Sequence, residues 1–245
     1  MTYCVGLLLD AGLVFLADSR TSAGVDQVST FRKVSVFERR KDRVIVLMSA
    51  GNLAVSQSVV SLIHEHRAAP NEVNIDTAPN MFEAARYVGD VLREVHRRDA
   101  AALKEHGVEF NASFILGGQI RNEPPRLFSL YPAGNFIEAT ADTPYLQIGE
   151  SKYGKPIIDR VVTRSTSLAQ AAKCALISMD STIRSNVSVG LPLDLLCVKR
   201  DALQVHSHVN IDADHEYFKL IGGRWSESLR HAFHAMPDPE WLRQS

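Results

Sequence analysis

The sequence predicts an α+β fold in which β-sheets pack between layers of helices. Segments with strand-like and helix-like patterns alternate in blocks along the 245 residues, in the order strands, two helices, strands, two helices, strands. Some of the strand-like segments are continuous apolar runs, a pattern typical of strands that are covered on both faces. Helix layers outside packed sheets provide such cover, so a layered sandwich is expected.

The first block contains four strand candidates. Tyr3–Leu9 and Leu13–Asp18 are apolar runs joined by the turn Asp10–Gly12, which is typical of a β-hairpin. Lys33–Glu38 alternates between polar and apolar residues, and Arg43–Ser49 is a continuous apolar run. The N-terminus is therefore expected to lie within a sheet.

The remaining elements repeat this order. Two amphipathic helices are expected at Leu53–His66 and Met81–Lys104, where apolar residues recur at helical spacing. The later segments are four strands, two helices and two strands, at Ala112–Gly118, Arg126–Leu130, Phe136–Thr140, Tyr145–Gly149, Pro156–Val162, Leu168–Arg184, Leu193–Lys199 and Leu203–Val209. No linker rich in Gly, Ser or Pro divides the chain, so one domain is expected over 1–245.

The C-terminal part, from about residue 212 to 245, is expected to be a helical extension of that domain. It carries an apolar stripe at Trp225, Leu229, Phe233 and Met236. Such a stripe either marks a subunit interface or packs onto its own domain.

Composition restricts the partners and the compartment. The 27 Lys and Arg residues nearly balance the 28 Asp and Glu residues, so no overall charge would attract nucleic acid or a membrane surface. Cys4, Cys174 and Cys197 are widely spaced in apolar surroundings, which indicates reduced thiols and a cytoplasmic location. No apolar run approaches the roughly 20 residues of a membrane-spanning helix. A protein, peptide or small-molecule partner is expected.

The chain begins Met-Thr, and Thr2 is a candidate nucleophile. Methionine aminopeptidases generally remove Met1 before a small residue, which would leave Thr2 with a hydroxyl and a free α-amine. The amine can then accept the proton of the hydroxyl, a recognised way to activate a weak nucleophile. Alternatively, Thr2 has no catalytic role, because many proteins begin with Met-Thr.

Several further segments favour the first interpretation. LADSRTSAG (residues 16–24) ends the second strand, Lys33 lies on the next, and SAGNLA (Ser49–Ala54) precedes the first long helix. With FILGGQI and RLFSLYPAGNF downstream, these segments resemble the proteasome β-subunit family of N-terminal-nucleophile hydrolases, in order and from Thr2 to about Lys199. The segment IGESKYGKPIIDR and the long C-terminal part are most similar to its bacterial ancestral β-subunit group, Anbu.

This resemblance implies a four-layer αββα sandwich of two antiparallel sheets between helix layers. It also implies a threonine-type endopeptidase that cleaves peptides or unfolded proteins without a metal or organic cofactor. Self-association into a ring or an open helical oligomer of about a dozen or more subunits would follow. Whether an ATPase supplies the substrate is left open.

Three residues would form the catalytic centre implied by the resemblance. Thr2 would be the nucleophile and, through its amine, the base. Lys33 would place an ammonium group near the Thr2 hydroxyl and lower its pKa, and Asp18 would orient Lys33. The alternative for Asp18 and Lys33 is a surface salt bridge between neighbouring strands.

The surrounding residues follow from the same resemblance. The backbone N–H of Gly51 would stabilise the oxyanion, because glycine permits close approach of the backbone. A shift of a few residues in the comparison would give this role to Met48. Thr21, Ser49 and Leu53 would lie near the pocket for the substrate side chain, which suggests a small or apolar preference.

The residues that would hold the Thr2 amine depart from the family pattern. Ser151 and Ser188 are the counterparts of two serines, but Ser185 stands where an acid is expected. A missing carboxylate would affect amine protonation and rate, so a proteasome-like structural or binding subunit with weak or no activity is the alternative. An esterase elbow at Ser188 is disfavoured, because NVSVG lacks the first glycine of that motif.

A metal site is a further alternative. His206 and His208 lie two residues apart on an expected strand, with Asp212, Asp214 and His215 nearby. A polar run of this kind is more often a solvated strand end or a subunit contact, so no metal is expected.

Overall fold

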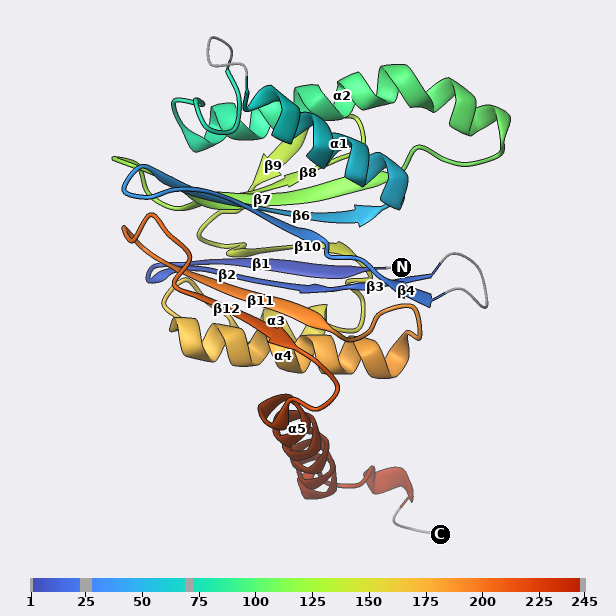
Figure 1. The fold of residues 1–245 in the computed structure, drawn as a ribbon. Helices are drawn as coiled ribbons and strands as arrows, with labels where there is room; N and C mark the ends of the chain where they lie inside the picture. Colours follow the sequence, from blue (N-terminus) through green and yellow to red (C-terminus); the bar gives the residue numbers. More distant parts are fainter. Residues whose placement is uncertain (1, 23–27, 69–72, 243–245) are drawn as a thin grey trace.

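The computed structural model describes residues 2–22, 28–68 and 73–242. Within them, two five-stranded antiparallel sheets lie face to face between two helix layers (Figure 1). The predicted four-layer αββα arrangement is confirmed. Met1 and the last two residues of LADSRTSAG, Ala23 and Gly24, lie outside the described residues.

The first sheet contains the N-terminal hairpin at its centre. Its strand order is β10-β1-β2-β11-β12. The strands are β1 (Tyr3–Leu9), β2 (Gly12–Asp18), β10 (Tyr145–Gly149), β11 (Leu193–Lys199) and β12 (Ser207–Ile211). Every residue of β1 and β2 is buried, as the continuous apolar pattern predicts. The strand that begins one residue after Thr2 is therefore rigidly mounted.

The outer face of this sheet is covered by two helices. They are α3 (Lys155–Val161) and α4 (Leu168–Ser185). The helix α5 (Glu216–Ala235) projects away from α4 and is followed by a short 3-10 helix, Glu240–Leu242 (Figure 1).

The second sheet has the order β5-β6-β7-β8-β9. Its strands are β5 (Val34–Arg39), β6 (Arg43–Gly51), β7 (Ala112–Ile120), β8 (Arg126–Leu130) and β9 (Phe136–Glu138). The helices α1 (Leu53–His66) and α2 (Met81–Glu105) cover its outer face (Figure 1). A short hairpin of β3 (Arg20–Ser22) and β4 (Val28–Thr30) connects the two sheets in sequence.

The layer between the sheets is apolar and closely packed. Phe15 of β2, Val46 of β6 and Ile115 of β7 are completely buried there. A Cβ atom on Gly117 would lie 2.8 Å from the Phe15 ring, so glycine lets the aromatic side chain fit between the sheets. This packing fixes β1 relative to β6, the two strands that carry opposite sides of the site described below.

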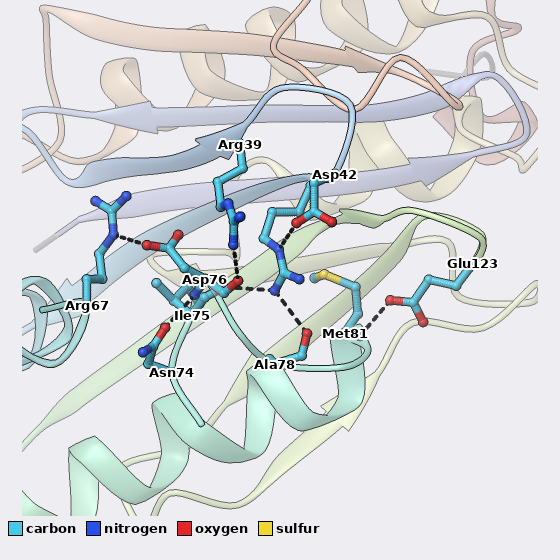
Figure 2. Close-up of polar contacts among 10 residues, drawn as sticks. Arg39, Asp42, Arg67, Asn74, Ile75, Asp76, Ala78, Met81 and Glu123 are labelled. Atoms are coloured by element: carbon cyan, nitrogen blue, oxygen red, sulfur yellow. Dashed lines mark hydrogen bonds and ion pairs between the residues drawn. The ribbon is translucent and has the colours of Figure 1, made fainter. Parts of the chain in front are cut away.

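The loop between α1 and α2 is tied to the β5–β6 hairpin by arginines (Figure 2). Arg43 is buried and donates from Nη1 to Ala78 O at 2.9 Å and to Ile75 O at 3.3 Å. Arg39 Nη1 donates to Asp76 O at 3.1 Å. These bonds satisfy loop carbonyls that helices and strands leave unpaired, at the end of β6 opposite to Gly51.

One strand prediction needs correction, and one short hairpin was not predicted. The strand expected at Leu203–Val209 lies at Ser207–Ile211, because Asp201 and Leu203 adopt positive φ values of 64° and 50° in a turn. Asp201 N donates to Gln119 Oε1 at 2.8 Å and holds this turn against β7. The β3–β4 hairpin was not predicted, since each strand has only three residues.

Candidate active site

Thr2 lies immediately before β1 and is 8% exposed. Its carbonyl accepts a hydrogen bond from Glu150 N at 2.7 Å, just after β10. Gly149 has φ of +81°, and a Cβ atom on it would lie 1.9 Å from Thr2 O. Only glycine allows this approach of the two backbones, so the Gly-Glu dipeptide of IGESKYG fixes the position of Thr2.

Lys33, just ahead of β5, points towards the end of β2. Its Nζ lies 2.8 Å from Asp18 Oδ1 and also donates to Arg20 O at 2.6 Å. The Lys33 and Asp18 side chains are only 5% and 0% exposed. A salt bridge on the protein surface, the alternative interpretation, is therefore excluded by burial, while the predicted pairing of the two residues is observed.

Asp18 is held by backbone donors as well as by Lys33. Tyr3 N donates to Asp18 Oδ1 at 3.0 Å, and Gly190 N donates to Asp18 Oδ2 at 3.3 Å. Burial raises the pKa of the Asp18 carboxyl above its ordinary value, and the Lys33 ammonium and the two N–H groups oppose this effect. Asp18 thus links β1, β2, the lysine and the loop before β11 in one network.

A cavity of about 100 Å³ opens beside Thr2. It is lined by Thr2, Thr21, Lys33, Ser49, Ala50, Gly51, Leu53 and Ser56. Six of these residues are the nucleophile, lysine, oxyanion and pocket residues predicted from the sequence. Ala50 and Ser56 were not predicted. Ser56 could have been, because it lies three residues after Leu53 on α1 and shares its face.

Gly51 ends β6 at the cavity wall. Its φ is +104°, and a Cβ atom would lie 2.2 Å from Asn111 O. The chain turns there into α1, whose N-cap Asn52 accepts from Ala54 N and Val55 N. Met48, the alternative oxyanion donor, is buried between the sheets and does not line the cavity.

The loop after α4 lies next to this network. Asn186 caps α4, and its Oδ1 accepts from Ser188 N at 2.9 Å. Its Nδ2 donates to Glu150 Oε2 at 3.1 Å. Ser185 is exposed at the end of α4, and Ser151 O accepts from Lys155 N in the turn that begins α3. Glu150 was not predicted, because a glutamate in a turn is usually exposed to solvent and no local sequence pattern indicates that this one is buried.

The remaining candidates are placed in structural roles. His208 Nε2 lies 3.0 Å from Asp194 Oδ1, and Asp212 Oδ1 accepts from Asp214 N. His215 Nδ1 accepts from Phe218 N at the start of α5. Within the described ranges, no cluster of three or more His, Cys, Asp or Glu side chains is arranged to bind a metal ion.

The three cysteines are free thiols, as predicted. Cys4 is fully buried on β1, two residues after Thr2, and donates to Ser49 O at 3.6 Å. Burial raises the pKa of the Cys4 thiol, so it stays protonated and is a poor nucleophile. In the part of the chain that the structure describes, no helix is both long and apolar enough to cross a membrane.

Comparisons with known proteins identify the family of the chain. The family model for the proteasome subunit matches residues 2–195. The chain is 24% identical over 216 residues to the proteasome subunit beta of Haloquadratum walsbyi, covering 86% of this chain and 79% of that protein.

Solved structures give a closer match. The Anbu (ancestral beta-subunit) structure from Yersinia bercovieri is 50% identical, with a TM-score of 0.92 over 97% of this chain and 99% of that one. The helical assembly of the Anbu complex from Pseudomonas aeruginosa is 47% identical, with a TM-score of 0.92 over 97% and 98% of the two chains. This chain therefore belongs to the proteasome subunit family, and its similarity within that family is to the ancestral β-subunit, Anbu.

Proposed function

We propose that this chain is a threonine peptidase of the proteasome type. The observation that carries the proposal is one small cavity lined by Thr2, Lys33 and Gly51, with Lys33 held by a buried carboxylate. These are a nucleophile, a cation and a backbone donor, the groups that acyl transfer needs. The finding that the chain belongs to the proteasome subunit family supports the same conclusion.

In the proposed reaction, removal of Met1 frees the Thr2 amine. The amine accepts the proton of the Thr2 hydroxyl as its oxygen attacks the peptide carbonyl carbon. Gly51 N–H stabilises the resulting oxyanion, and the Lys33 ammonium stabilises the developing charge on the Thr2 oxygen. The carbon–nitrogen bond breaks, the amine proton passes to the leaving nitrogen, and an ester remains on Thr2.

Water then attacks the ester carbonyl with the Thr2 amine again acting as base. The carbon–oxygen bond breaks and the carboxylic acid product leaves, which regenerates Thr2. Thr21, Ser49 and Leu53, with Ala50 and Ser56, line the space available to the substrate side chain. The small volume of this space supports cleavage after a small residue.

We also propose that the chain works in a homo-oligomer. The related structure from Pseudomonas aeruginosa is a helical assembly of the Anbu complex. Phe233 on α5, Met236 at its C-cap and Trp241 on the short helix that follows are 74%, 66% and 81% exposed. Large apolar side chains with this exposure are typical of subunit interfaces.

The second candidate function is a structural or binding subunit without hydrolysis. It is favoured by one observation, the exposed Ser185 at the position where the family has an acid. Under this alternative the cavity would not turn over peptides, whatever the state of the N-terminus.

The two functions are separated by the mature N-terminus and by Thr2→Ala. Intact mass should show loss of Met1, and a mixed peptide library should be cleaved by the wild type and not by Thr2→Ala. The particle size of the variant should match that of the wild type. Equal turnover by Thr2→Ala, or retention of Met1 in every molecule from cells, would contradict the peptidase.

A further inference from the structure

We propose that Glu150 holds the α-ammonium group of mature Thr2, in place of the acid that is absent at Ser185. The inference rests on the proposed function, because it concerns the amine that Met1 removal sets free. It gives Glu150 the role of a positioning residue that orients the base and stabilises the positive charge which the base acquires when it takes the hydroxyl proton.

The backbone of Glu150 contacts Thr2 directly. Its N–H donates to Thr2 O at 2.7 Å, and the close approach of Gly149 presses the two chain segments together. The main chain of Glu150 therefore contacts the residue that carries the nucleophile. Asp18, the other buried acid of the site, contacts the next residue, Tyr3, and is already paired with Lys33.

The carboxylate of Glu150 is only half satisfied. The residue is 4% exposed, and Oε2 accepts from Asn186 Nδ2 at 3.1 Å. Oε1 is buried without a hydrogen-bond partner, and within residues 2–22, 28–68 and 73–242 Glu150 forms no ion pair. A buried carboxylate without a counter-charge is costly, so this site is one that favours a cation. Removal of Met1 creates an ammonium group on the residue that Glu150 contacts.

One loop fixes Glu150 together with Asp18. Asn186 holds the Glu150 carboxylate and also accepts from Ser188 N, and further along the same loop the N–H of Gly190 donates to Asp18 Oδ2. The loop thereby orients two carboxylates with different partners, Asp18 for Lys33 and Glu150 for the amine.

The chemical value of this arrangement lies in the proton transfer. The amine accepts the hydroxyl proton during attack, so positive charge develops on the Thr2 nitrogen. A carboxylate nearby stabilises that charge and raises the pKa of the amine, as an opposite charge within a few ångströms does. A carboxylate that orients and stabilises a protonated base has the same function in serine hydrolases.

The test measures the pKa of the Thr2 amine without using hydrolysis. Wild type and Glu150→Gln are produced as N-terminal fusions whose specific protease leaves Thr2 as the first residue. Each is treated with acetic anhydride over a pH series, and acetylation of the N-terminal peptide is followed by mass spectrometry. Glu150→Gln should lower the pKa of the Thr2 amine by about one unit or more. Values that agree within about 0.2 units would overturn the proposal.

A matched control comes from the loop ahead of α2. Asp76 also has a buried carboxylate oxygen without a partner, and its second oxygen pairs with Arg67 (Figure 2). Asp76→Asn removes the same charge from a loop that lies at the end of β6 opposite to Gly51, so it should leave the pKa of the Thr2 amine unchanged. An equal fall in both variants would mean a net-charge effect and would contradict the proposal.

A second measurement covers the case in which Glu150→Gln does not fold. An extra glycine ahead of Thr2 converts the amine to an amide. In the wild type, the Thr2-first protein should have a higher Tm than this extended form, because the ammonium pairs with Glu150. Equal Tm values for the two forms of the wild type would contradict the pairing of the Thr2 ammonium with Glu150. The measurement does not depend on hydrolysis, so it applies equally to an inactive protein.

Discussion

Lys33 Nζ lies 2.8 Å from Asp18 Oδ1, and neither side chain is more than 5% exposed. Removal of one member of such a pair leaves a buried charge without its partner. We therefore expect Lys33→Met to lower the free energy of unfolding by about 3 kcal/mol or more at neutral pH. Urea unfolding followed by circular dichroism measures this change.

The matched double variant separates stability from catalysis. Asp18→Asn in the Lys33→Met background removes the unpaired charge, while the amide oxygen still accepts from Tyr3 N. The free energy of unfolding should recover in part, whereas hydrolysis should stay absent in both variants. Recovered hydrolysis would contradict the role of Lys33, and absence of any gain in stability would contradict the importance of the pair.

Titration of Asp18 gives a pH dependence of stability with a definite sign. Burial raises the pKa of Asp18 in the folded state, so folded protein binds this proton more tightly than the unfolded chain. Between the ordinary and the raised pKa, the contribution of Asp18 to the free energy of unfolding therefore falls as the pH rises. Comparison of wild type with Asp18→Asn between about pH 4 and pH 7 isolates it. A difference that moves the opposite way would contradict the raised pKa.

The sequence predicts most of the fold because many of its strands are continuous apolar runs and its helices have regular apolar spacing. β1 and the helix α1 have the predicted bounds, since continuous burial and helical periodicity are both local signals. The shift of β12 has a non-local cause, the contact between Asp201 and Gln119 on β7. Such contacts between distant segments leave no pattern in the local sequence.

The site shows the same division. Thr2, Lys33 and Asp18 can be predicted because the segments that contain them resemble those of the proteasome β-subunit family in order and spacing. Glu150 is not, because its burial depends on Asn186, 36 residues later in the chain. A glutamate in a turn is usually solvated, so the sequence alone predicts an exposed side chain for Glu150, whereas the structure shows a buried one.

The cavity volume predicts a preference for small residues at the cleavage position. Leu53, at the first turn of α1, forms part of its wall. Leu53→Ala should enlarge the pocket and raise kcat/KM for peptides with a larger apolar residue at that position by about 10-fold, the effect of one or two methylene groups. Peptides with alanine there should be less affected. A larger preference for small residues in Leu53→Ala would contradict the assignment of the pocket.

The apolar face of α5 predicts an interface. Phe233→Asp should reduce the mass of the assembly, measured by light scattering, because the Phe233 side chain is 74% exposed. Its effect on the stability of the single chain should be small, since this side chain packs little in its own subunit. His231→Asp introduces the same residue at an exposed position on the opposite side of the helix and serves as the control. Equal masses for Phe233→Asp and wild type would exclude this face from the interface.

The contact between Gly149 and Thr2 O allows a test of how strongly activity depends on the position of Thr2. Gly149→Ala would bring Cβ to 1.9 Å from Thr2 O at a φ of +81°, so the backbone of Thr2 must move. Gly107 has a similar φ of +69°, but a Cβ atom there would have no neighbouring atom within 4 Å. Gly107→Ala therefore reports the backbone strain alone, about 1 kcal/mol, and should keep full hydrolysis. Gly149→Ala should be less stable than this control and should lose hydrolysis by at least about 100-fold, because a shift of about 1 Å disrupts the reacting geometry. Both are measured by urea unfolding and by turnover of the same peptide, and equal turnover in the two variants would show that the contact with Gly149 does not position the nucleophile.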